Sequence, residues 1–223
     1  MDLNTCIIWD WNGTLLDDTS ACVGALNEML AERGREPLTL EYFRDHFAFP
    51  ARRFYAFIGL DVPDSEWQAH AREYHERYAR QPGIRLNDEA RAALERVRAS
   101  GARQVVLSAL HQRLLEADLA RYGIREYFDR VVGSDNFDGA SKLERGRELL
   151  AQLGEGRYVL IGDSLHDLEV ATALGIECVL VATGGHSYAR LAAAGRAERS
   201  LLSALSVCGF ASASDAAEAG NLV

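Results

Sequence analysis

The sequence predicts an α/β protein, in which a doubly wound parallel sheet forms a Rossmann-like core and a small all-helical domain is inserted after the first strand. Short apolar runs rich in β-branched residues alternate with segments of helical periodicity. The stretch from Leu15 to about Ile84 contains no strand-like pattern. Polar residues follow three of the apolar runs, at the end where an open parallel sheet binds its ligands.

The expected strands are nearly continuous apolar runs, which are typical of strands buried on both faces. They lie at residues 6–9, 105–107, 131–132, 158–161 and 178–181. Because helical segments separate them, we expect the strands to run parallel and helices to cover both faces of the sheet.

Three helices are expected between these strands, each with a cap residue before its apolar face and a glycine after it. The cap and the final glycine are, in order, Asn87-Asp88 and Gly101, Ser141 and Gly154, and Ser164 and Gly175. Each helix therefore has a length that fits a crossover between parallel strands.

Residues 16–84 are expected to form a helical cap domain, while residues 1–15 and 85–208 form the α/β core. Two stripes at helical spacing indicate the inserted domain: Val23, Leu26 and Leu30, and then Trp67, Ala71, Tyr74 and Tyr78. We interpret these apolar and aromatic stripes as packing inside that domain. Residues 209–223 are rich in Ala, Ser, Gly and acidic residues, and we expect them to form a flexible tail.

The composition limits the classes of partner. The formal net charge is −9, which argues against a nucleic-acid partner, since such a partner requires a clustered basic face. No run approaches the roughly 18 apolar residues of a membrane span, and the N-terminal residues carry no basic flank or cleavage signal. We therefore expect a cytoplasmic protein with neither a membrane nor a nucleic-acid partner.

Lys142 is the only lysine in the chain, because every other basic residue among the 24 Lys and Arg is an arginine. An ammonium group is a compact and strongly hydrated point charge, whereas a guanidinium group is a planar fork. This single exception marks Lys142 as a candidate functional residue.

Chemically useful side chains follow the ends of three expected strands. Asp10 follows the first strand, Ser108 the second and Asp163 the fourth. Asp167 lies four residues beyond Asp163, and Lys142 opens the helix before the fourth strand. Because the carboxyl ends of parallel strands lie along one edge of a sheet, we expect these five groups to line one pocket.

Carboxylates that lie close together repel one another unless a cation neutralises them. Asp10, Asp163 and Asp167 therefore indicate a hard divalent ion, and an all-oxygen ligand set favours Mg²⁺ over zinc. A magnesium ion together with a lysine and a serine hydroxyl is suited to hold a phosphoryl group. The cation would also offset repulsion between Asp10 and an anionic substrate, so that this carboxylate can act as a nucleophile.

Four motifs occur in order along the chain. They are Asp10-Trp11-Asn12-Gly13-Thr14-Leu15, Val106-Leu107-Ser108, Lys142, and Gly162-Asp163-Ser164-Leu165-His166-Asp167. Together they resemble the four motifs of the haloacid dehalogenase superfamily, of which the first is usually Asp-x-Asp-Gly-Thr and the last Gly-Asp-x-x-x-Asp. The helical insert is similar to the cap of the phosphoglycolate-phosphatase-like branch. The resemblance covers nearly the whole chain apart from the tail.

The resemblance implies a role for each matching residue. Asp10 is the implied nucleophile, and Lys142 is implied to stabilise it and the transferring group. The implied metal ligands are Asp10, Asp163, Asp167 and the main-chain carbonyl of Asn12. The implied phosphate-binding groups are Asn12, Gly13, Ser108, the amide of Ala109, and Lys142. The cap is implied to close over the pocket, exclude water and select the substrate.

Asn12 departs from the family pattern, which has an aspartate there that protonates the leaving oxygen and later activates water. An amide does not titrate, so it cannot act as a general acid or base, and the loss of such a group costs about 10²–10⁴ in rate. Either the substrate has a good leaving group or another residue replaces the acid. The candidates for that replacement are Asp17, Asp18 and His111.

Four residues are candidate substrate contacts. Arg52 and Arg53 lie where a loop of the insert enters a helix, and either can reach an anionic substrate. His186 follows the fifth strand in Thr183-Gly184-Gly185-His186, and His111 follows the second motif.

We therefore expect a Mg²⁺-dependent phosphatase that hydrolyses a small phosphorylated metabolite, a phosphomonoester, through an aspartyl-phosphate on Asp10. Two further functions stay open. A catalytically weak or inactive phosphate-binding relative is compatible with Asn12. A metal-independent 2-haloacid dehalogenase also needs no acid at position 12, because halide leaves unprotonated, but Asp163 would then be a buried charge without a use.

Overall fold

The structure, a computed structural model, describes residues 5–135 and 142–210. A six-stranded sheet forms its centre, with the order β5-β4-β1-β6-β7-β8, and all neighbouring strands are parallel. The strands are β1 (Thr5–Trp9), β4 (Arg103–His111), β5 (Arg130–Ser134), β6 (Arg157–Gly162), β7 (Glu177–Val181) and β8 (Ala197–Glu198). The five predicted strands and the parallel sheet are confirmed. The two-residue β8 was not predicted, since it is too short to give a periodic signal.

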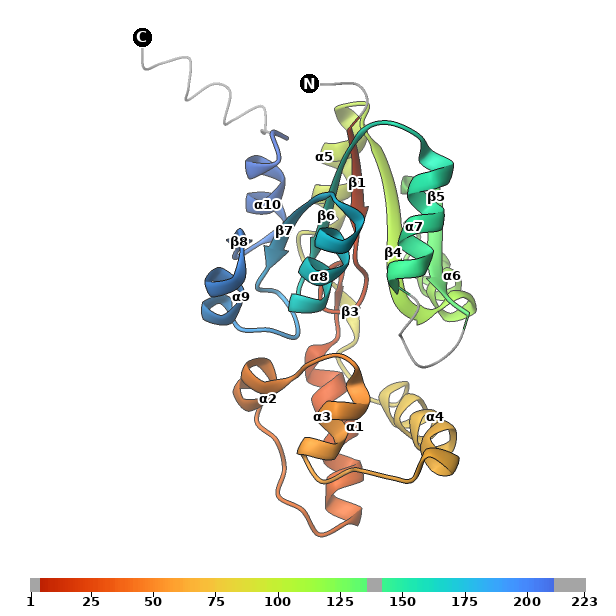
Figure 1. Ribbon diagram of the computed structural model, residues 1–223, viewed down its shortest axis with the longest axis vertical. Coiled ribbons are helices and arrows are strands. Elements are labelled where there is room, and N and C mark those ends of the chain that lie inside the picture. The colour runs from red at the N-terminus through yellow and green to blue at the C-terminus, as the bar shows by residue number, and fades with distance from the viewer. Residues whose placement is uncertain (1–4, 136–141, 211–223) are drawn as a thin grey trace.

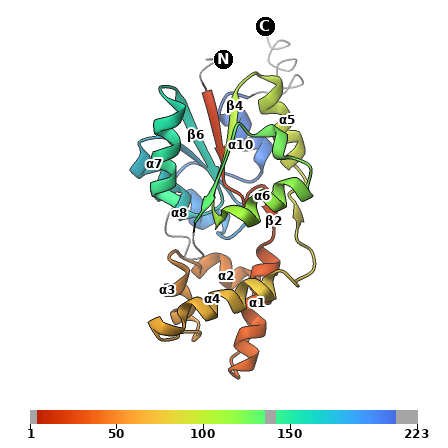
Figure 2. The ribbon, with the colours of Figure 1, turned by 90° about the vertical axis from the view of Figure 1, so that its right-hand side faces the viewer.

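Helices cover both faces of this sheet. One face carries α5 (Ala90–Ala99), α6 (Gln112–Arg121) and α10 (Leu201–Val207), and the other carries α7 (Lys142–Leu153) and α8 (Leu165–Leu174). Figure 2 shows α5 and α6 on one side of the strands and α7 and α8 on the other. Side chains of β1 alternate between two apolar clusters, with Ile7 and Trp9 on the first face and Cys6 and Ile8 on the second. The sheet is therefore buried on both faces, as predicted.

Short elements complete the core. The 3-10 turn η2 (Arg125–Tyr127) precedes β5, and α9 (Tyr188–Ala194) connects β7 to β8. The N-cap residues predicted for the helices are found in part. The side chain of Asn87 accepts a hydrogen bond from the backbone amide of Glu89, just before α5 begins. Ser164 and Asp167 form a capping box on α8, while Ser141 lies outside the described residues.

Four helices lie between β1 and α5 and form a layer below the sheet in Figure 1; we call them the cap. They are α1 (Thr19–Glu32), α2 (Leu40–His46), α3 (Ala51–Phe57) and α4 (Trp67–Tyr78), with the 3-10 turn η1 (Asp64–Glu66) before the last. The cap has an apolar cluster of its own, which includes Leu26, Met29, Phe43 and Phe54. This separate cluster supports the predicted division into residues 16–84 and the rest, which stays a prediction.

The chain enters and leaves the cap through a pair of short strands, β2 (Leu16–Asp17) and β3 (Arg85–Leu86). They pair antiparallel, and Arg85 and Asp17 form an ion pair across them at 2.7 Å. The two-residue β2 interrupts the stretch in which no strand was expected. Both connections to the cap therefore lie side by side.

A second set of contacts joins the cap to the core at the end of α2. The carbonyl of Phe47 lies 2.9 Å from Nε2 of His186 and accepts a hydrogen bond from Arg190 at 2.7 Å. From the cap, Nε of Arg44 donates to the carbonyl of Gly184 at 3.0 Å. These bonds hold the cap against the loop that follows β7.

His186 is buried and neutral in this contact. Its Nδ1 accepts a hydrogen bond from the backbone amide of Leu165 at 3.0 Å, so the ring proton lies on Nε2 and points to the carbonyl of Phe47. Burial, assisted by the nearby Arg190, lowers the pKa of His186 to about 4. A second ring proton would remove the acceptor on which the Leu165 amide depends.

Phe210 corrects the predicted start of the tail. Its side chain is 2% exposed and belongs to the apolar cluster under α5 and α10, and its backbone amide bonds to the carbonyl of Leu205 at 2.9 Å. Most of the apolar residues from position 209 onward are alanines, so little in the sequence indicated this one anchor. Residues 211–223 lie outside the described part of the chain.

We predict that Phe210→Ala lowers the free energy of unfolding by about 3 kcal/mol, because it removes a buried aromatic ring from the core. Phe57→Ala is the matched control, since that ring is 60% exposed and its loss should change stability by no more than about 0.5 kcal/mol. Urea denaturation of both variants measures the difference. Equal stabilities would contradict the packing of Phe210.

We predict that acid destabilises the fold through His186. The unfolded imidazole takes up a proton near pH 6.5 and the folded one near pH 4, so stability is complete above the first value and falls as the pH drops toward the second. The loss attributable to this residue between pH 7 and pH 5 is about 2 kcal/mol. Urea denaturation at both pH values should show a smaller loss for His186→Gln than for the wild type; equal losses would contradict the assignment.

Candidate active site

Asp10 lies at the carboxyl end of β1, where the strand leaves the sheet, and its side chain is almost fully buried. Its backbone amide donates to the carbonyl of Ile161 on β6 at 2.9 Å, which continues the sheet pairing by one residue. Its Oδ1 accepts a hydrogen bond from Nζ of Lys142 at 2.5 Å, and its Oδ2 accepts one from the hydroxyl of Thr14 at 3.2 Å. The carboxylate is therefore fixed in orientation from two sides.

Lys142, at the start of α7, joins two carboxylates. Its Nζ also donates to Oδ1 of Asp167 at 2.5 Å, and the lysine side chain is 2% exposed. The other oxygen of Asp167 accepts hydrogen bonds from the backbone amide and the hydroxyl of Ser164, at 3.0 and 2.6 Å. The N-terminal turn of α8 thus fixes Asp167, and Asp167 fixes the ammonium group beside Asp10.

Asp163 completes a group of three carboxylates with Asp10 and Asp167, which we call the acidic cluster. One oxygen of each lies within 4.8 Å of the others, and all three residues are buried. Asp163 follows β6, and its Oδ2 accepts a hydrogen bond from the backbone amide of Gly185. The structure therefore brings together the acids that the sequence predicted to converge.

The charges in the acidic cluster do not balance. Burial raises the pKa of Asp163 well above its usual range, and repulsion by Asp10 adds to the effect. Burial also raises the pKa of Asp10, to about 6, although the Lys142 ammonium opposes it. Burial disfavours the charge on Asp167 too, but there the Lys142 ammonium outweighs burial and lowers the pKa.

One ammonium group therefore faces three buried carboxylates. A hard divalent cation with oxygen ligands would neutralise the remaining charge, so the donor set fits Mg²⁺.

Two glycines give Asp163 its space. A Cβ on Gly13, which has φ +76°, would lie 2.3 Å from Oδ2 of Asp163, and a Cβ on Gly184 would lie 2.2 Å from the same oxygen. Real Cβ atoms do not approach so closely, so both positions require glycine. Gly13 after β1 and Gly184 after β7 therefore leave room for the side chain of Asp163 in the acidic cluster.

Ser108 and Ala109 line the same cavity as the acidic cluster. The sequence predicted that the strand would end at residue 107, but β4 continues to His111, and its pairing with β5 is irregular between Leu107 and His111. Ser108 is buried, and its hydroxyl accepts a hydrogen bond from the backbone amide of Leu110 at 3.0 Å. This irregular stretch turns the strand's last residues toward the cavity.

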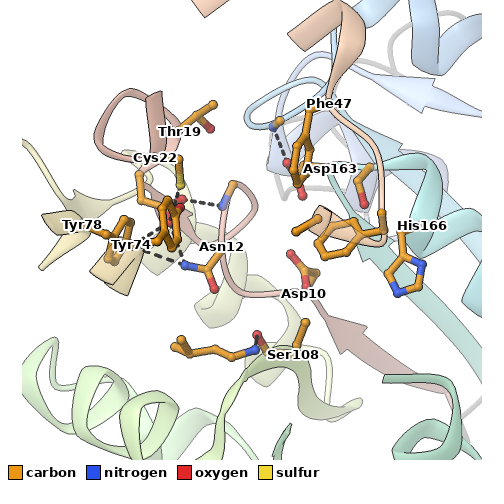
Figure 3. A pocket seen from close by; sticks show the side chains of 18 of the residues that line it. Asp10, Asn12, Thr19, Cys22, Phe47, Tyr74, Tyr78, Ser108, Asp163 and His166 are labelled. Atoms are coloured by element: carbon orange, nitrogen blue, oxygen red, sulfur yellow. Dashed lines mark hydrogen bonds between the residues drawn. The ribbon is translucent and has the colours of Figure 1, made fainter. Parts of the chain in front are cut away.

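The side chain of Asn12 is held by a buried acid. Its Nδ2 donates to Oδ2 of Asp18 at 2.7 Å and lies 3.4 Å from the hydroxyl of Tyr78, which itself donates to Asp18 at 2.7 Å. The other oxygen of Asp18 accepts the backbone amide of Gly13 at 2.8 Å. Figure 3 shows the amide nitrogen of Asn12 turned toward Tyr78. The amide oxygen is therefore the end that is left for the cavity.

A cavity of about 220 Å³ lies between the core and the cap and includes the acidic cluster. Its core side is lined by Asp10, Asn12, Gly13, Ser108, Ala109, Leu110, His111, Lys142, Asp163, Ser164, His166, Asp167 and Gly185. Its cap side is lined by Asp18, Thr19, Cys22, Leu26, Phe43, Phe47, Phe49, Ala51, Tyr55, Trp67, Ala71, Tyr74, His75 and Tyr78. The predicted catalytic and metal-binding residues share this cavity.

The aromatic stripe of α4 does more than pack inside the cap, which corrects the interpretation based on sequence. Trp67, Tyr74 and Tyr78 also line the cavity, together with rings from other cap helices. A stripe at helical spacing predicts a buried face, but periodicity does not reveal whether that face meets protein or ligand. The stripe therefore packs against the apolar cluster of the cap, as predicted, and lines the cavity as well.

Three predicted substrate contacts do not line the cavity. Arg52 pairs with Asp64 and lies over the ring of Trp67, and Arg53 is exposed on α3. His186 is occupied by its two bonds to the cap and the core and lies behind Gly185. His111 does line the cavity, and its Nδ1 caps α6 by accepting the backbone amide of Arg113 at 3.3 Å.

The two acids proposed as substitutes for the missing acid differ in position. Asp18 lines the cavity, whereas Asp17 forms its ion pair with Arg85 outside it. Burial raises the pKa of Asp18, but hydrogen bonds from Asn12, Tyr78 and the amide of Gly13 favour its ionised form. Asp18 thus serves first as the acceptor that orients Asn12.

Comparison with known proteins gives matches along most of the chain. A family model described as haloacid dehalogenase-like hydrolase matches residues 7–181. A phosphoglycolate phosphatase of Caulobacter vibrioides is 29% identical over 199 residues, which covers 82% of this chain and 81% of that protein.

Solved structures agree with the fold. The structure of protein tyrosine kinase A (PtkA) of Mycobacterium tuberculosis has a TM-score of 0.68 and 25% identity, and the match covers 81% of this chain and 85% of that one. A haloacid dehalogenase-like family hydrolase of Streptococcus pneumoniae has a TM-score of 0.70 and 18% identity, with 93% and 99% covered. Within residues 5–135 and 142–210, no helix has the length and apolar character needed to cross a membrane.

Proposed function

Because the chain belongs to the haloacid dehalogenase-like hydrolases, we propose that it is a phosphatase that hydrolyses a small phosphomonoester through a phosphorylated Asp10. The observation that carries this proposal is the buried contact of Lys142 with Asp10 and Asp167, next to the unbalanced acidic cluster. The name of the Caulobacter relative, phosphoglycolate phosphatase, supports the same reaction class.

In the first step, a carboxylate oxygen of Asp10 attacks phosphorus and the bond to the ester oxygen breaks. Lys142 lies beside the nucleophile and stabilises negative charge on the transferring group. The Ser108 hydroxyl and the amide of Ala109 line the cavity on the side of β4, where each can donate to a phosphoryl oxygen. The second step releases phosphate when water attacks the phosphorylated Asp10.

The side chains of the acidic cluster and the backbone carbonyl of Asn12 would hold Mg²⁺. When bound, this ion neutralises phosphoryl oxygens and lets an anionic substrate approach Asp10. The same charge allows all three acids to ionise together, which burial and mutual repulsion otherwise oppose.

Asn12 distinguishes this site from one that has a general acid at position 12. Its amide nitrogen is held by Asp18 and its oxygen can accept a hydrogen bond from water, but neither group can take or give a proton at neutral pH. The leaving group therefore departs as an anion and takes its proton from solvent. Hydrolysis of the phosphorylated Asp10 is slowed for the same reason.

Phosphoryl transfer from Asp10 to an acceptor other than water is a second candidate function. Asn12 favours it, because an enzyme intermediate that water attacks slowly lives long enough to meet another acceptor. The similarity to a protein named tyrosine kinase is compatible with this reaction. The reaction products distinguish the two functions, because free phosphate supports hydrolysis and a phosphorylated alcohol supports transfer.

Phosphate binding without catalysis and dehalogenation would each give a distinct experimental result. A phosphate-binding protein without catalysis would bind phosphate analogues with Mg²⁺ and release no product. A metal-independent dehalogenase would release halide in the presence of a chelator.

We predict that Asp10→Asn lowers turnover of p-nitrophenyl phosphate by at least about 10³-fold, because it removes the nucleophile. Turnover by the wild type should require Mg²⁺ and stop with a chelator. Asp129→Asn is the matched control, since Asp129 pairs with Arg103 at 2.9 Å in a partly exposed contact away from the cavity. Activity retained in Asp10→Asn would dismiss the nucleophile.

We predict that an acid at position 12 works only when position 18 changes with it. Asn12→Asp alone places two carboxylates in direct contact, where they repel and share a proton. Asn12→Asp combined with Asp18→Asn keeps the contact with donor and acceptor exchanged.

Relative to the wild type and to Asp18→Asn alone, this double variant should raise kcat/KM for alkyl phosphates by about 10²–10⁴. Its gain for p-nitrophenyl phosphate should be much smaller, because that leaving group needs no acid. An unchanged rate for alkyl phosphates would mean that another group already supplies the proton.

A further inference from the structure

Aromatic rings line much of the cap side of the cavity. Phe47 and Phe49 follow α2, with centroids 5.2 Å apart, and Tyr74 and Tyr78 lie on α4, with centroids 6.1 Å apart. Figure 3 shows Phe47 and Tyr74 on opposite sides of the space next to Asp10. A group attached to a phosphate on Asp10 would therefore meet aromatic surface from two cap segments.

Fixed cations are missing from this surface. Of the residues that line the cavity, Lys142 is the only lysine or arginine, and its ammonium is already shared by Asp10 and Asp167. The sequence outside the described ranges contains neither residue type, so it cannot supply one. The guanidinium of Arg52 lies over the Trp67 ring, 5.4 Å from its centroid, and is paired with Asp64. A substrate carboxylate would therefore find no guanidinium among the lining residues and would approach the buried acid Asp18.

Three histidines line the cavity, and His111 is engaged there as the N-cap of α6. The other two do not replace the missing cation. Burial lowers the pKa of His75, which keeps that ring neutral at pH 7. His166 packs flat against Phe49, with ring centroids 4.7 Å apart, so its face extends the aromatic wall. Its Nδ1 lies 3.4 Å from the carboxylate of Glu169, which already offers it a negative partner.

The missing acid at position 12 points to the same kind of leaving group. A phenol ionises near pH 10, whereas water and simple alcohols ionise some 5 or 6 units higher. A phenolate can therefore leave phosphorus without being protonated in the same step, and an alkoxide leaves only with help from an acid. Asn12 gives no such help, so the site is chemically suited to esters of phenols.

On these two independent grounds, we propose that this enzyme acts on aryl phosphates, phosphomonoesters whose leaving group is an apolar phenol, and that the rings of the cap bind that phenol. This inference rests on the proposed function and names its substrate class. In the reaction the bond from phosphorus to the phenolic oxygen breaks as the bond to Asp10 forms. The phenolate takes a proton from solvent, and water then releases phosphate and restores the Asp10 carboxylate.

A binding measurement with analogues that are not hydrolysed tests the aryl preference independently of turnover. Benzylphosphonate and phosphonoacetate share a methylene phosphonate that is not hydrolysed, and they differ only in carrying a phenyl ring or a carboxylate. We expect calorimetry with Mg²⁺ to show benzylphosphonate binding at least about tenfold more tightly than methylphosphonate, and phosphonoacetate no more tightly than methylphosphonate. Phosphonoacetate that binds as tightly as benzylphosphonate would overturn the inference.

A variant with a cation at the rim tests the site itself. Phe49→Arg brings a guanidinium beside the cavity and should remove the preference for benzylphosphonate over phosphonoacetate. Phe57→Arg, the same change at a 60% exposed ring outside the cavity, should leave the preference unchanged. A preference that survives Phe49→Arg would place the aromatic group elsewhere and overturn the inference.

Turnover decides between this inference and the proposal on which it rests. We expect phenyl phosphate to exceed both 2-phosphoglycolate and cyclohexyl phosphate in kcat/KM, by at least about tenfold. If 2-phosphoglycolate is the better substrate, the phosphatase stands and the aryl preference falls. If no ester is hydrolysed with Mg²⁺ and no phosphonate binds, both fall.

Discussion

A single ammonium group among three buried carboxylates is the interaction on which the rest of this structure depends. Lys142 lies within hydrogen-bond distance of Asp10 and Asp167, and Asp163 lies close to both without a cation of its own. Such a cluster is costly to bury, so the surrounding chain is built to hold it: a capping box orients Asp167, and glycines make room for Asp163. The residues around the acidic cluster therefore hold three carboxylates in place with only one ammonium group, that of Lys142, among them.

The cap and the core contribute different kinds of side chain to the cavity. The core contributes the three acids of the acidic cluster, Lys142 and the strand ends to the cavity. The cap contributes rings, an orienting acid for Asn12 and almost no charge toward the cavity. In the proposed function, reaction and substrate choice therefore depend on separate parts of the chain, and the hydrogen bond between Asn12 and Asp18 joins the two.

Much of this arrangement could be predicted from the sequence, because it follows from short-range patterns. Apolar runs located the five longer strands, and the rule for the carboxyl ends of parallel strands brought Asp10, Ser108 and Asp163 together. What could not be predicted depends on tertiary packing. Arg52 turned toward Asp64, and the ring stripe of α4 met the cavity, because helix orientation decides both. The pairing of Asn12 with Asp18 also had no sequence signal, although the two lie only six residues apart.

The paired strands β2 and β3 have a consequence for how a substrate enters. Because both connections to the cap run through this one ladder, the ladder can act as a hinge about which the cap rotates as a rigid body. A second contact between cap and core lies at the end of α2, where the carbonyl of Phe47 is bonded to His186 and Arg190. An opening of the cap about this ladder would have to break these bonds, and they lie next to the cavity, since Phe47 lines it.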